Sequence, residues 1–327
     1  PTGRWPPRSS TWTCRGMSGS PRIFVAGHQG LVGSALVRRL ADEGYPPPIV
    51  RTRAQLDLED RRAVRDFMQR ERPDVVLLAA AKVGGILAND TFPADFIAAN
   101  LAIGLNVITA AYEVGVRRLI NLGSSCIYPR KAPQPIREEY LLTGPLEPTN
   151  RAYAIAKIAA LELCESYNRQ YGTDFITLMP TNLYGPGDNF DPETSHVLPG
   201  LLRRFHEAKE SGANEVVVWG TGTPRREFLY VDDLADACVF LMGAEAVPER
   251  LNVGVGKDIT IAELAETIRG VVGFRGAIRF DPSKPDGTPR KLLDVSRLNA
   301  LGWGPQVEFE EGLESTYDWF RSQEGAG

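Results

Sequence analysis

Tyr153 and Lys157 are the two side chains whose types and spacing most directly suggest catalysis. From these residues to about Tyr171 the sequence contains no Pro or Gly and is rich in good helix formers. Residues four apart share one face of a helix, so the phenol and the ammonium are expected one turn apart. A nearby ammonium lowers the pKa of a phenol from its reference of about 10, which would let the tyrosine exchange a proton near neutral pH. By itself the pair is also compatible with an ordinary helix surface.

A glycine triplet supplies the first context for this pair. The apolar strand expected over 22–26 runs into Gly27-His28-Gln29-Gly30-Leu31-Val32-Gly33, and a helix is expected over 34–43, ended by Gly44. Glycines permit a tight turn and a close approach of the backbone to a pyrophosphate at the helix N-terminus. The spacing is G-x-x-G-x-x-G, but the strand before it and the helix after it indicate a dinucleotide site.

The end of the next expected strand, over 49–52, favours NADP as the cofactor. Arg53 stands where NAD-binding proteins often carry an acid for the ribose 2′-hydroxyl. A guanidinium suits a 2′-phosphate, although a solvated loop arginine is the alternative. Asp57 and Leu58 are candidates for the border of the adenine.

The order of the expected elements indicates an α/β fold of the Rossmann type. A helix over 60–70, a strand over 74–78, a helix over 94–114 and strands over 116–122 and 174–179 alternate as a doubly wound parallel sheet requires. Residues 180–187 are expected as a loop that leads out of the sheet, followed by a helix over 198–209 and a strand over 215–219. The cofactor domain is therefore expected over 21–180 with about 227–253. A smaller mixed α/β substrate lobe is expected over about 181–226 with 254–327.

Ser124 and Cys126 follow the strand over 116–122 directly. If this segment stays extended, their side chains point to one side and Ser125 points to the other. A hydroxyl and a thiol would then lie together at the carboxyl end of a parallel strand, where such folds bind ligands. A serine that caps a turn and a buried structural cysteine are the alternative.

The composition is that of an ordinary globular protein. The chain has 327 residues, of which 43% are hydrophobic and 24% are charged, and a net charge of -4 gives no reason to expect nucleic acid or an anionic membrane as partner. No apolar run is expected to reach the roughly 20 residues of a membrane span. Cys14, Cys126, Cys164 and Cys238 form no C-x-x-C motif and are expected to be reduced, in a cytoplasmic protein. His28, His196 and His206 show no metal-ligand spacing, so no metal is expected.

Residues 1–20 differ from the rest of the chain. They carry three arginines, three prolines and two tryptophans, no acidic residue and no apolar signal-peptide core. We expect a disordered extension upstream of a natural start at Met17, with a short transit peptide as the alternative.

The glycine triplet, Ser124 and the Tyr153–Lys157 pair, in this order and on these elements, resemble the extended short-chain dehydrogenases/reductases that act on nucleotide sugars. The resemblance spans 22 to about 321. Five stretches narrow it to the members that epimerise and then reduce GDP-4-keto-6-deoxy-D-mannose: Ala81–Ile86, Leu122–Pro129, Leu146–Asn150, Pro180–Gly187 and Lys284–Asp294.

The resemblance implies roles residue by residue. Ser124, Tyr153 and Lys157 match the reductase triad, and Cys126 and His196 match the base and the acid of the epimerisation. The NADP site is implied at Gly27, His28, Gln29, Gly30, Leu31, Val32, Gly33, Arg53, Asp57, Leu58, Leu122, Gly123, Ser124, Ser125, Lys157, Pro180, Thr181, Asn182, Leu183 and His196. Substrate contacts are implied at Arg204, Trp219, Arg226 and Asp286, for which ordinary surface or core roles are the alternative.

The implied chemistry suits these side chains. The 4-keto group acidifies the hydrogens on carbons 3 and 5, which a Cys126 thiolate can remove and a protonated His196 can return. Reference pKa values of about 8.5 and about 6.5 make a thiol and an imidazole a plausible base and acid near neutral pH. NADPH would then reduce carbon 4, with Tyr153 donating a proton and Ser124 bonding the developing oxyanion. Arg204 and Arg226 suit the diphosphate, and Trp219 suits the base or the sugar.

Two other functions remain open at this point, a 4-epimerase and a non-catalytic regulator, and a third, a 4,6-dehydratase, is discounted. An NAD-retaining nucleotide-sugar 4-epimerase needs the triad but neither Cys126 nor His196. A 4,6-dehydratase would carry an Asp-Glu pair where Ser125-Cys126 stands, and a non-catalytic NADP-binding regulator usually lacks the tyrosine or the lysine. The resemblance also implies a homodimer, in which the helices over 94–114 and 153–171 pair across an axis as a four-helix bundle.

Overall fold

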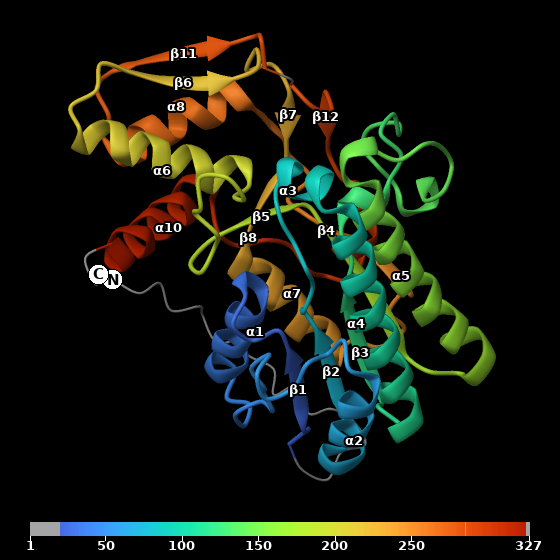
Figure 1. Cartoon of the computed structure of the whole chain (residues 1–327). Coiled ribbons are helices and arrows are strands. Elements are labelled where there is room, and N and C mark those ends of the chain that lie inside the picture. The colour runs from blue at the N-terminus through green and yellow to red at the C-terminus, as the bar shows by residue number, and fades with distance from the viewer. Residues whose placement is uncertain (1–19, 285, 325–327) are drawn as a thin grey trace.

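The computed structural model describes residues 20–284 and 286–324 (Figure 1). The expectation for residues 1–20 therefore falls, apart from Ser20, outside the described residues, as does Cys14.

A parallel sheet of five strands forms the centre of the fold, in the order β1-β2-β3-β4-β9. Its strands are β1 (Ile23–Ala26), β2 (Val75–Leu78), β3 (Arg118–Leu122), β4 (Phe175–Pro180) and β9 (Arg250–Val253). Nearly all their residues are buried, as expected for a parallel sheet that helices cover on both faces. The prediction of a Rossmann-type α/β fold is thereby confirmed.

The strand predicted over 49–52 is wrong in extent, because only Ile49 pairs, as a single parallel bridge to Phe24. Prolines at 46, 47 and 48 have no N–H and so cannot extend the ladder on the N-terminal side of Ile49, and residues 50–52 form no further pairs on the other side. Ile49 lies on the side of β1 opposite to β2, so the direction of winding reverses at β1. The carboxyl end of β1 is therefore the switch point at which open α/β sheets bind ligands.

Helices cover the two faces of this sheet (Figure 1). On one face lie α1 (Leu31–Asp42) and α7 (Val231–Gly243), and on the other α2 (Arg61–Glu71), α4 (Pro93–Val114) and α5 (Arg151–Tyr171). The helix predicted over 34–43 begins three residues earlier, at Leu31, because Gly30 is its N-cap residue. α7 and α1 pack against each other, as do α4 and α5.

By length and composition alone, α4 is apolar enough to cross a membrane, so the prediction that no run reaches that length is wrong. Half of its most apolar window is buried inside the molecule. The buried side, which includes Val107, Ile108 and Ala111, packs on the sheet with α2 and α5. Such burial is expected for the core helix of a globular domain.

A second hydrophobic cluster lies beyond the carboxyl ends of the strands, at the top of Figure 1. There α6 (Val197–Glu210), α8 (Ile261–Val272) and α10 (Phe309–Glu324) pack with the parallel pair β6 (Glu215–Trp219) and β11 (Ala277–Asp281). The predicted helix over 198–209 and strand over 215–219 are confirmed. The substrate lobe is expected to include residues 254–327. Within that range, Leu298 and Trp303 pack instead in the hydrophobic cluster with α1 and α7.

Short elements connect the two parts. The loop predicted over 180–187 contains a strand, β5 (Asn182–Tyr184), which pairs in parallel with β8 (Phe228–Tyr230). A second small sheet joins β10 (Ile259–Thr260), β7 (Arg225–Arg226) and β12 (Arg290–Lys291). The remaining short helices are α3 (Ile86–Thr91), α9 (Ser296–Ala300) and the 3-10 turns η1 (Ser125–Ile127), η2 (Glu138–Tyr140) and η3 (Pro148–Asn150).

Candidate active site

The glycine turn between β1 and α1 leaves no room for side chains at two of its three glycines. Gly27 has a φ of +89°, and a Cβ there would lie 2.7 Å from the backbone nitrogen of Ala80. A Cβ at Gly33 would overlap the carbonyl oxygen of Gly27. The free N–H groups of the first turn of α1 are thus open to a ligand, which suits a pyrophosphate.

The other implied cofactor residues lie around this turn at the carboxyl ends of the strands. Residues 122–125 end β3 and residues 180–183 end β4, and these strands are neighbours in the sheet. Thr181 and Asn182 both donate hydrogen bonds to the backbone oxygen of Glu227. His28 has a buried Nδ1 without a hydrogen-bond partner, which fits a site that a ligand completes. These features together fit a dinucleotide such as NADP.

Arg53 is largely exposed and forms an ion pair with Glu59, at 2.8 Å. Asp57, whose carboxylate accepts a hydrogen bond from the backbone N–H of Glu59, and Leu58 follow in the same turn. The 2′-phosphate role of Arg53 and the adenine contacts of Asp57 and Leu58 stay predictions.

The structure brings the expected triad together. Lys157 of α5 donates a hydrogen bond of 2.8 Å from Nζ to the backbone oxygen of Leu122, at the end of β3. The same Nζ lies 5.8 Å from the centre of the Tyr153 ring. The Ser124 hydroxyl acts on the Tyr153 phenol in the direction that lowers its pKa. Two consecutive turns of one helix and the end of one strand therefore build this cluster.

The prediction that Lys157 lowers the pKa of Tyr153 is wrong for the protein without cofactor. Burial and, after it, the charge of Cys126 raise the pKa of Tyr153, and the Ser124 hydrogen bond only partly opposes them. Burial lowers the pKa of Lys157 to about 8. Tyr153 therefore rests as a protonated phenol, which is the form that a proton donor requires.

Ser124 and Cys126 lie together for a different reason than the one predicted. The segment is not extended, since residues 125–127 form the 3-10 turn η1. Ser124 is its N-cap, and its Oγ accepts a hydrogen bond of 3.1 Å from the backbone N–H of Cys126. Serine is a favoured N-cap residue because its side chain satisfies such a donor. A turn, not strand alternation, directs both side chains into the site.

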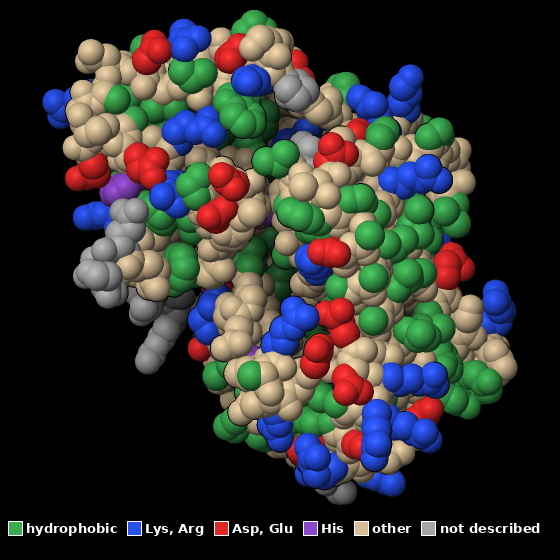
Figure 2. Space-filling model, viewed as in Figure 1, with side chains coloured by type: hydrophobic (Ala, Val, Ile, Leu, Met, Phe, Trp, Pro, Cys, Tyr) green, Lys and Arg blue, Asp and Glu red, His purple; other side chains and the backbone are tan. Residues whose placement is uncertain are grey.

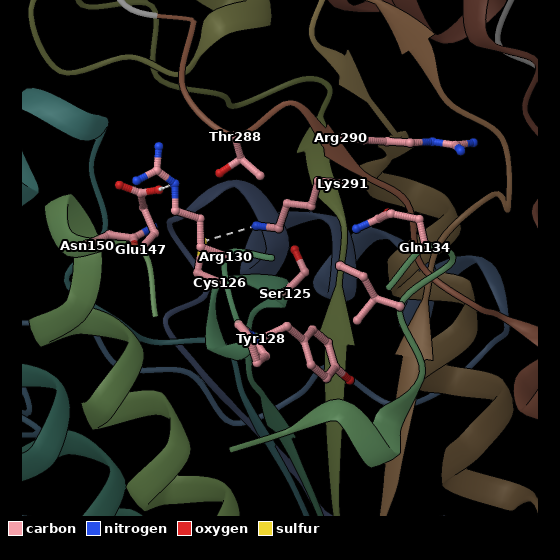
Figure 3. Close-up of a pocket in the computed structure, with 12 residues that line it drawn as sticks. Ser125, Cys126, Tyr128, Arg130, Gln134, Glu147, Asn150, Thr288, Arg290 and Lys291 are labelled. Atoms are coloured by element: carbon pink, nitrogen blue, oxygen red, sulfur yellow. Dashed lines mark hydrogen bonds and ion pairs between the residues drawn. The ribbon is translucent and has the colours of Figure 1, made fainter. Parts of the chain in front are cut away.

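The Cys126 thiol is half-buried and lies 3.4 Å from the ammonium Nζ of Lys291 (Figure 3). Burial by itself would raise the pKa of the thiol. The charge of Lys291 and hydrogen bonds with Ser124, Lys291 and Asn150 outweigh it, so the pKa of Cys126 lies below its usual value. The thiol is thus prepared to act as a base near neutral pH.

His196 is the N-cap residue of α6 and lies at the rim of the site. Although the residue is exposed, partial loss of hydration and, after it, the charge of Lys291 lower its pKa. A lowered pKa favours the neutral imidazole in the resting protein, and the role of His196 as the acid of the epimerisation stays a prediction. His196 must take up a proton during the reaction before it can return one.

The four expected substrate residues gather on the wall opposite the sheet. Trp219 is exposed, and Arg204 and Lys284 lie over its ring, at 5.7 Å and 5.6 Å from the centre. Asp286 accepts hydrogen bonds from the backbone N–H and the hydroxyl of Thr221, at 2.7 Å and 2.9 Å. Arg226 interacts electrostatically with both Cys126 and Asp286. Figure 2 shows the surface hollowed between this wall and the part of the molecule that carries the sheet.

Sequence reasoning missed Lys291 and Asn150. Both line the pocket around Cys126, together with Ser125, Tyr128, Pro129, Arg130, Gln134, Ile136, Glu147, Thr288 and Arg290. Both lie in stretches that the resemblance singled out, but neither residue type marks a role by itself. Within residues 20–284 and 286–324 no group of three or more His, Cys, Asp or Glu side chains could hold a metal ion.

Residues 23–254 match the NAD dependent epimerase/dehydratase family. The chain is 60% identical over 301 residues to GDP-L-fucose synthase 1 of Arabidopsis thaliana, covering 92% of this chain and 93% of that protein. It is 58% identical over 308 residues to GDP-L-fucose synthase of Escherichia coli (strain K12), covering 91% and 96%. Among solved structures, a GDP-L-fucose synthetase from Naegleria fowleri bound to NADP superposes with a TM-score of 0.86 at 31% identity, covering 95% and 97%.

Proposed function

Because the chain belongs to the NAD dependent epimerase/dehydratase family, and within it to the GDP-L-fucose synthases, we propose that it converts GDP-4-keto-6-deoxy-D-mannose to GDP-L-fucose with NADPH. The observation that carries this proposal is the meeting of two chemistries in one site. Ser124 accepts a hydrogen bond from the backbone of Cys126, whose thiol has a lowered pKa, and its hydroxyl also acts on the pKa of Tyr153 in the reductase pair. A reductase alone has no use for that thiol.

Epimerisation begins at Cys126. The thiolate removes the hydrogen from carbon 3 or carbon 5 as a proton, an S–H bond forms, and the C–H electron pair moves into an enolate whose charge rests on the 4-oxygen. The hydroxyls of Ser124 and Tyr153 donate to that oxygen and stabilise the charge. Negative charge on the sugar favours protonation of His196 by solvent water, and the imidazolium then delivers this proton to the opposite face of the carbon. Cys126 releases the proton that it removed to solvent before the second centre reacts.

Reduction follows at carbon 4. NADPH, when bound, supplies the hydride. Tyr153 donates its phenolic proton to the 4-oxygen, and Ser124 keeps its hydrogen bond to the same oxygen. Lys157, held by the Leu122 carbonyl, supports the tyrosine and contacts the nicotinamide ribose. The turn at Gly27, Gly30 and Gly33 holds the pyrophosphate at the N-terminus of α1.

The GDP portion lies along the opposite wall in this proposal. Arg204 and Arg226 pair with the diphosphate, whose two charges suit guanidinium groups. Trp219 offers an exposed aromatic face to the base or the sugar, and Asp286 receives a hydroxyl or an amine of the substrate. A nucleotide-sugar 4-epimerase would need neither Cys126 nor its lysine neighbour, so this alternative leaves the Cys126 pocket unexplained.

The division into a cofactor domain (21–180 with about 227–253) and a substrate lobe (about 181–226 with 254–327) is part of the proposal. The separate hydrophobic cluster around α6, α8 and α10 supports it. A cytoplasmic location is also proposed, supported by Cys126, Cys164 and Cys238, which are free thiols.

A homodimer through α4 and α5 completes the proposal. These helices pack against each other and expose Leu101, Leu105 and Ile155, with 39%, 51% and 37% of their surface accessible. Exposed apolar side chains gathered on neighbouring helices indicate an interface. Two copies of the pair would form a four-helix bundle.

The decisive assay measures NADPH consumption with GDP-4-keto-6-deoxy-D-mannose and identifies the product sugar. We expect one NADPH oxidised for each GDP-L-fucose formed, and no oxidation with GDP-mannose, which lacks the keto group. A parallel reaction with NADH measures cofactor preference. Unchanged nicotinamide absorbance in the presence of the keto sugar would refute the proposal.

A further inference from the structure

Lys291 approaches the active-site thiol from a part of the chain 165 residues away. It belongs to β12, the edge strand of the small sheet, where it pairs in register with Arg226 of β7. Its Nζ lies 3.4 Å from the Cys126 sulfur, and Figure 3 shows the side chain reaching across the pocket toward the thiol.

The backbone that follows Lys291 is held by hydrogen bonds. Next to it, the N–H of Leu292 donates to the side chain of Gln134 at 2.8 Å, and the N–H of Leu293 donates to the buried carboxylate of Glu227 at 3.0 Å. The carbonyl of Leu292 accepts from the N–H of Ile136 at 2.8 Å. Because the neighbouring backbone is anchored to two separate segments, residues 134–136 and Glu227, the ammonium is presented to the thiol from a rigid support.

The other cations around the pocket are directed elsewhere. Arg130 forms an ion pair with Glu147, at 3.1 Å, and Arg290 pairs with Asp258. Arg226 interacts electrostatically with Cys126, but its guanidinium donates a hydrogen bond to the backbone oxygen of Arg225. Tyr153 from α5, His196 at the start of α6 and Tyr128, which follows η1 and lines the pocket, are also titratable groups at this site. Lys291 is therefore the cation that contacts the sulfur directly.

We propose that Lys291 is a positioning residue that keeps Cys126 as a thiolate before the sugar binds. That the thiolate serves as the base of the epimerisation rests on the proposed function. The contact itself is a property of the free protein and is detectable without substrate. The same ammonium disfavours a second positive charge at His196, so the resting pair is a thiolate and a neutral imidazole.

The electrostatics agree with this geometry. Against the effect of burial, the charge of Lys291 is the leading influence that lowers the pKa of Cys126. The charge of Lys291 also lowers the pKa of His196, after burial. An opposite charge within a few ångströms favours the ionised form of a thiol, and a like charge disfavours imidazolium. Removal of the Lys291 ammonium should raise the pKa of both Cys126 and His196.

The test is alkylation of Cys126 by iodoacetamide across pH 6 to 10, followed by mass spectrometry of the tryptic peptide Leu119–Arg130, whose one cysteine is Cys126. Only the thiolate reacts, so the midpoint of the rate profile reports the thiol pKa. Wild-type protein should react with a midpoint below about 8.5, the value of a free cysteine. Lys291→Met should raise the midpoint by about one pH unit or more, and Lys291→Arg should restore most of the shift. Lys257→Met, at an exposed lysine, is the matched control and should behave as wild type.

Two results would overturn the proposal. One is a wild-type midpoint at or above that of free cysteine, which needs no variant and so does not depend on whether Lys291→Met folds. The other is an equal midpoint in wild-type and folded Lys291→Met protein, which would indicate a lysine that serves only substrate binding. Because no sugar is present, neither result depends on turnover, and failure of the NADPH assay would leave the alkylation result intact.

Discussion

At the scale of single residues, one hydroxyl connects the two halves of the proposed reaction. Ser124 accepts a hydrogen bond from the backbone N–H of Cys126, and its hydroxyl opposes the effect of burial on the pKa of both the thiol and the Tyr153 phenol. Charge on Cys126 raises the pKa of Tyr153, so an ionised base keeps the proton donor protonated. Once Cys126 has taken its proton, that influence ends. The arrangement suits a sequence in which epimerisation precedes reduction.

Cys126→Ser should abolish epimerisation and leave the cofactor site unchanged. A serine hydroxyl near neutral pH is not ionised, so it cannot remove the protons from carbons 3 and 5. We expect the rate of solvent deuterium incorporation at these carbons to fall by 10²-fold or more, on the order of the effect of losing a general base. NADPH affinity, measured by fluorescence titration, should stay as in wild type. Deuterium uptake at the wild-type rate would remove Cys126 from this role.

Ionisation of Asp188 should lower the free energy of unfolding as the pH rises from acid to neutral. Burial raises the pKa of its carboxyl to about 7, against a small opposing effect of the Asn189 backbone N–H. In the unfolded chain the group has a pKa near 3.9, so between these two values the folded state binds the extra proton and stability declines as pH rises. The decline should be on the order of 1 kcal/mol per pH unit and end near pH 7.

The measurement is the free energy of urea unfolding from pH 4.5 to 8 for wild type and Asp188→Asn. The free energy of unfolding of wild type relative to that of Asp188→Asn should decline with rising pH by the amount predicted above, because the amide of the variant does not ionise. Asp42→Asn, at an exposed carboxyl near the end of α1, is the matched control. A constant difference between wild type and Asp188→Asn would contradict the prediction.

At the scale of elements, the β1–α1 turn fixes where a ligand can approach. Gly27 adopts a left-handed conformation close to the backbone of Ala79 and Ala80, and Gly33 packs α1 directly on that turn. The N-terminus of α1 thereby lies at the switch point of the sheet, beside the ends of β2 and β3. Helix and strand must touch for the turn to be this tight.

Gly33→Ala should disrupt the cofactor site. The added methyl group meets backbone atoms of Gly27 and His28, which cannot rotate away, so α1 must move from β1. We expect NADPH affinity to fall at least tenfold in equilibrium binding. Gly270→Ala is the control: it lies in α8 with open space around it, and alanine should stabilise the helix by about 0.5–1 kcal/mol. Wild-type affinity in folded Gly33→Ala would show that the turn tolerates a side chain.

At the scale of the whole molecule, the two hydrophobic clusters meet at the site. The sheet side supplies the triad and the thiol, and the opposite part supplies His196, Trp219 and Arg226. Lys291 links the two, since its strand pairs with β7 while its side chain reaches the thiol on η1. A movement of one part against the other would therefore change the Cys126 environment.

Leu105→Glu should dissociate the proposed dimer. Leu105 on α4 is 51% exposed in the single chain, and a buried carboxylate in a bundle of four helices would be costly without a partner. Sedimentation velocity at micromolar protein should show a dimer for wild type and a monomer for the variant. Ser322→Glu on α10, on the other side of the molecule in Figure 1, should leave the dimer intact. A monomeric wild type would exclude the bundle.

The sequence by itself determined the elements whose signal is local. A buried strand, a glycine turn and a helix stand next to each other in the chain, as do the residues of the helix that carries Tyr153 and Lys157, so pattern and spacing were enough to predict both. The predictions failed at two places where the local pattern was misread. Residues 50–52 do not continue the bridge at Ile49, and a serine cap turned residues 124–127 out of an extended course.

Only the tertiary structure decided the charge states of the site. Burial reverses the expected pKa shift of Tyr153, and loss of hydration together with the charge of Lys291 lowers the pKa of His196. Both effects depend on the packing of segments that are distant in the chain. Lys291 is the clearest case, because no spacing rule relates it to Cys126 across 165 residues. An electrostatic contact depends on distance in space, and that distance is set only once the small sheet of β7 and β12 has closed over the end of β3.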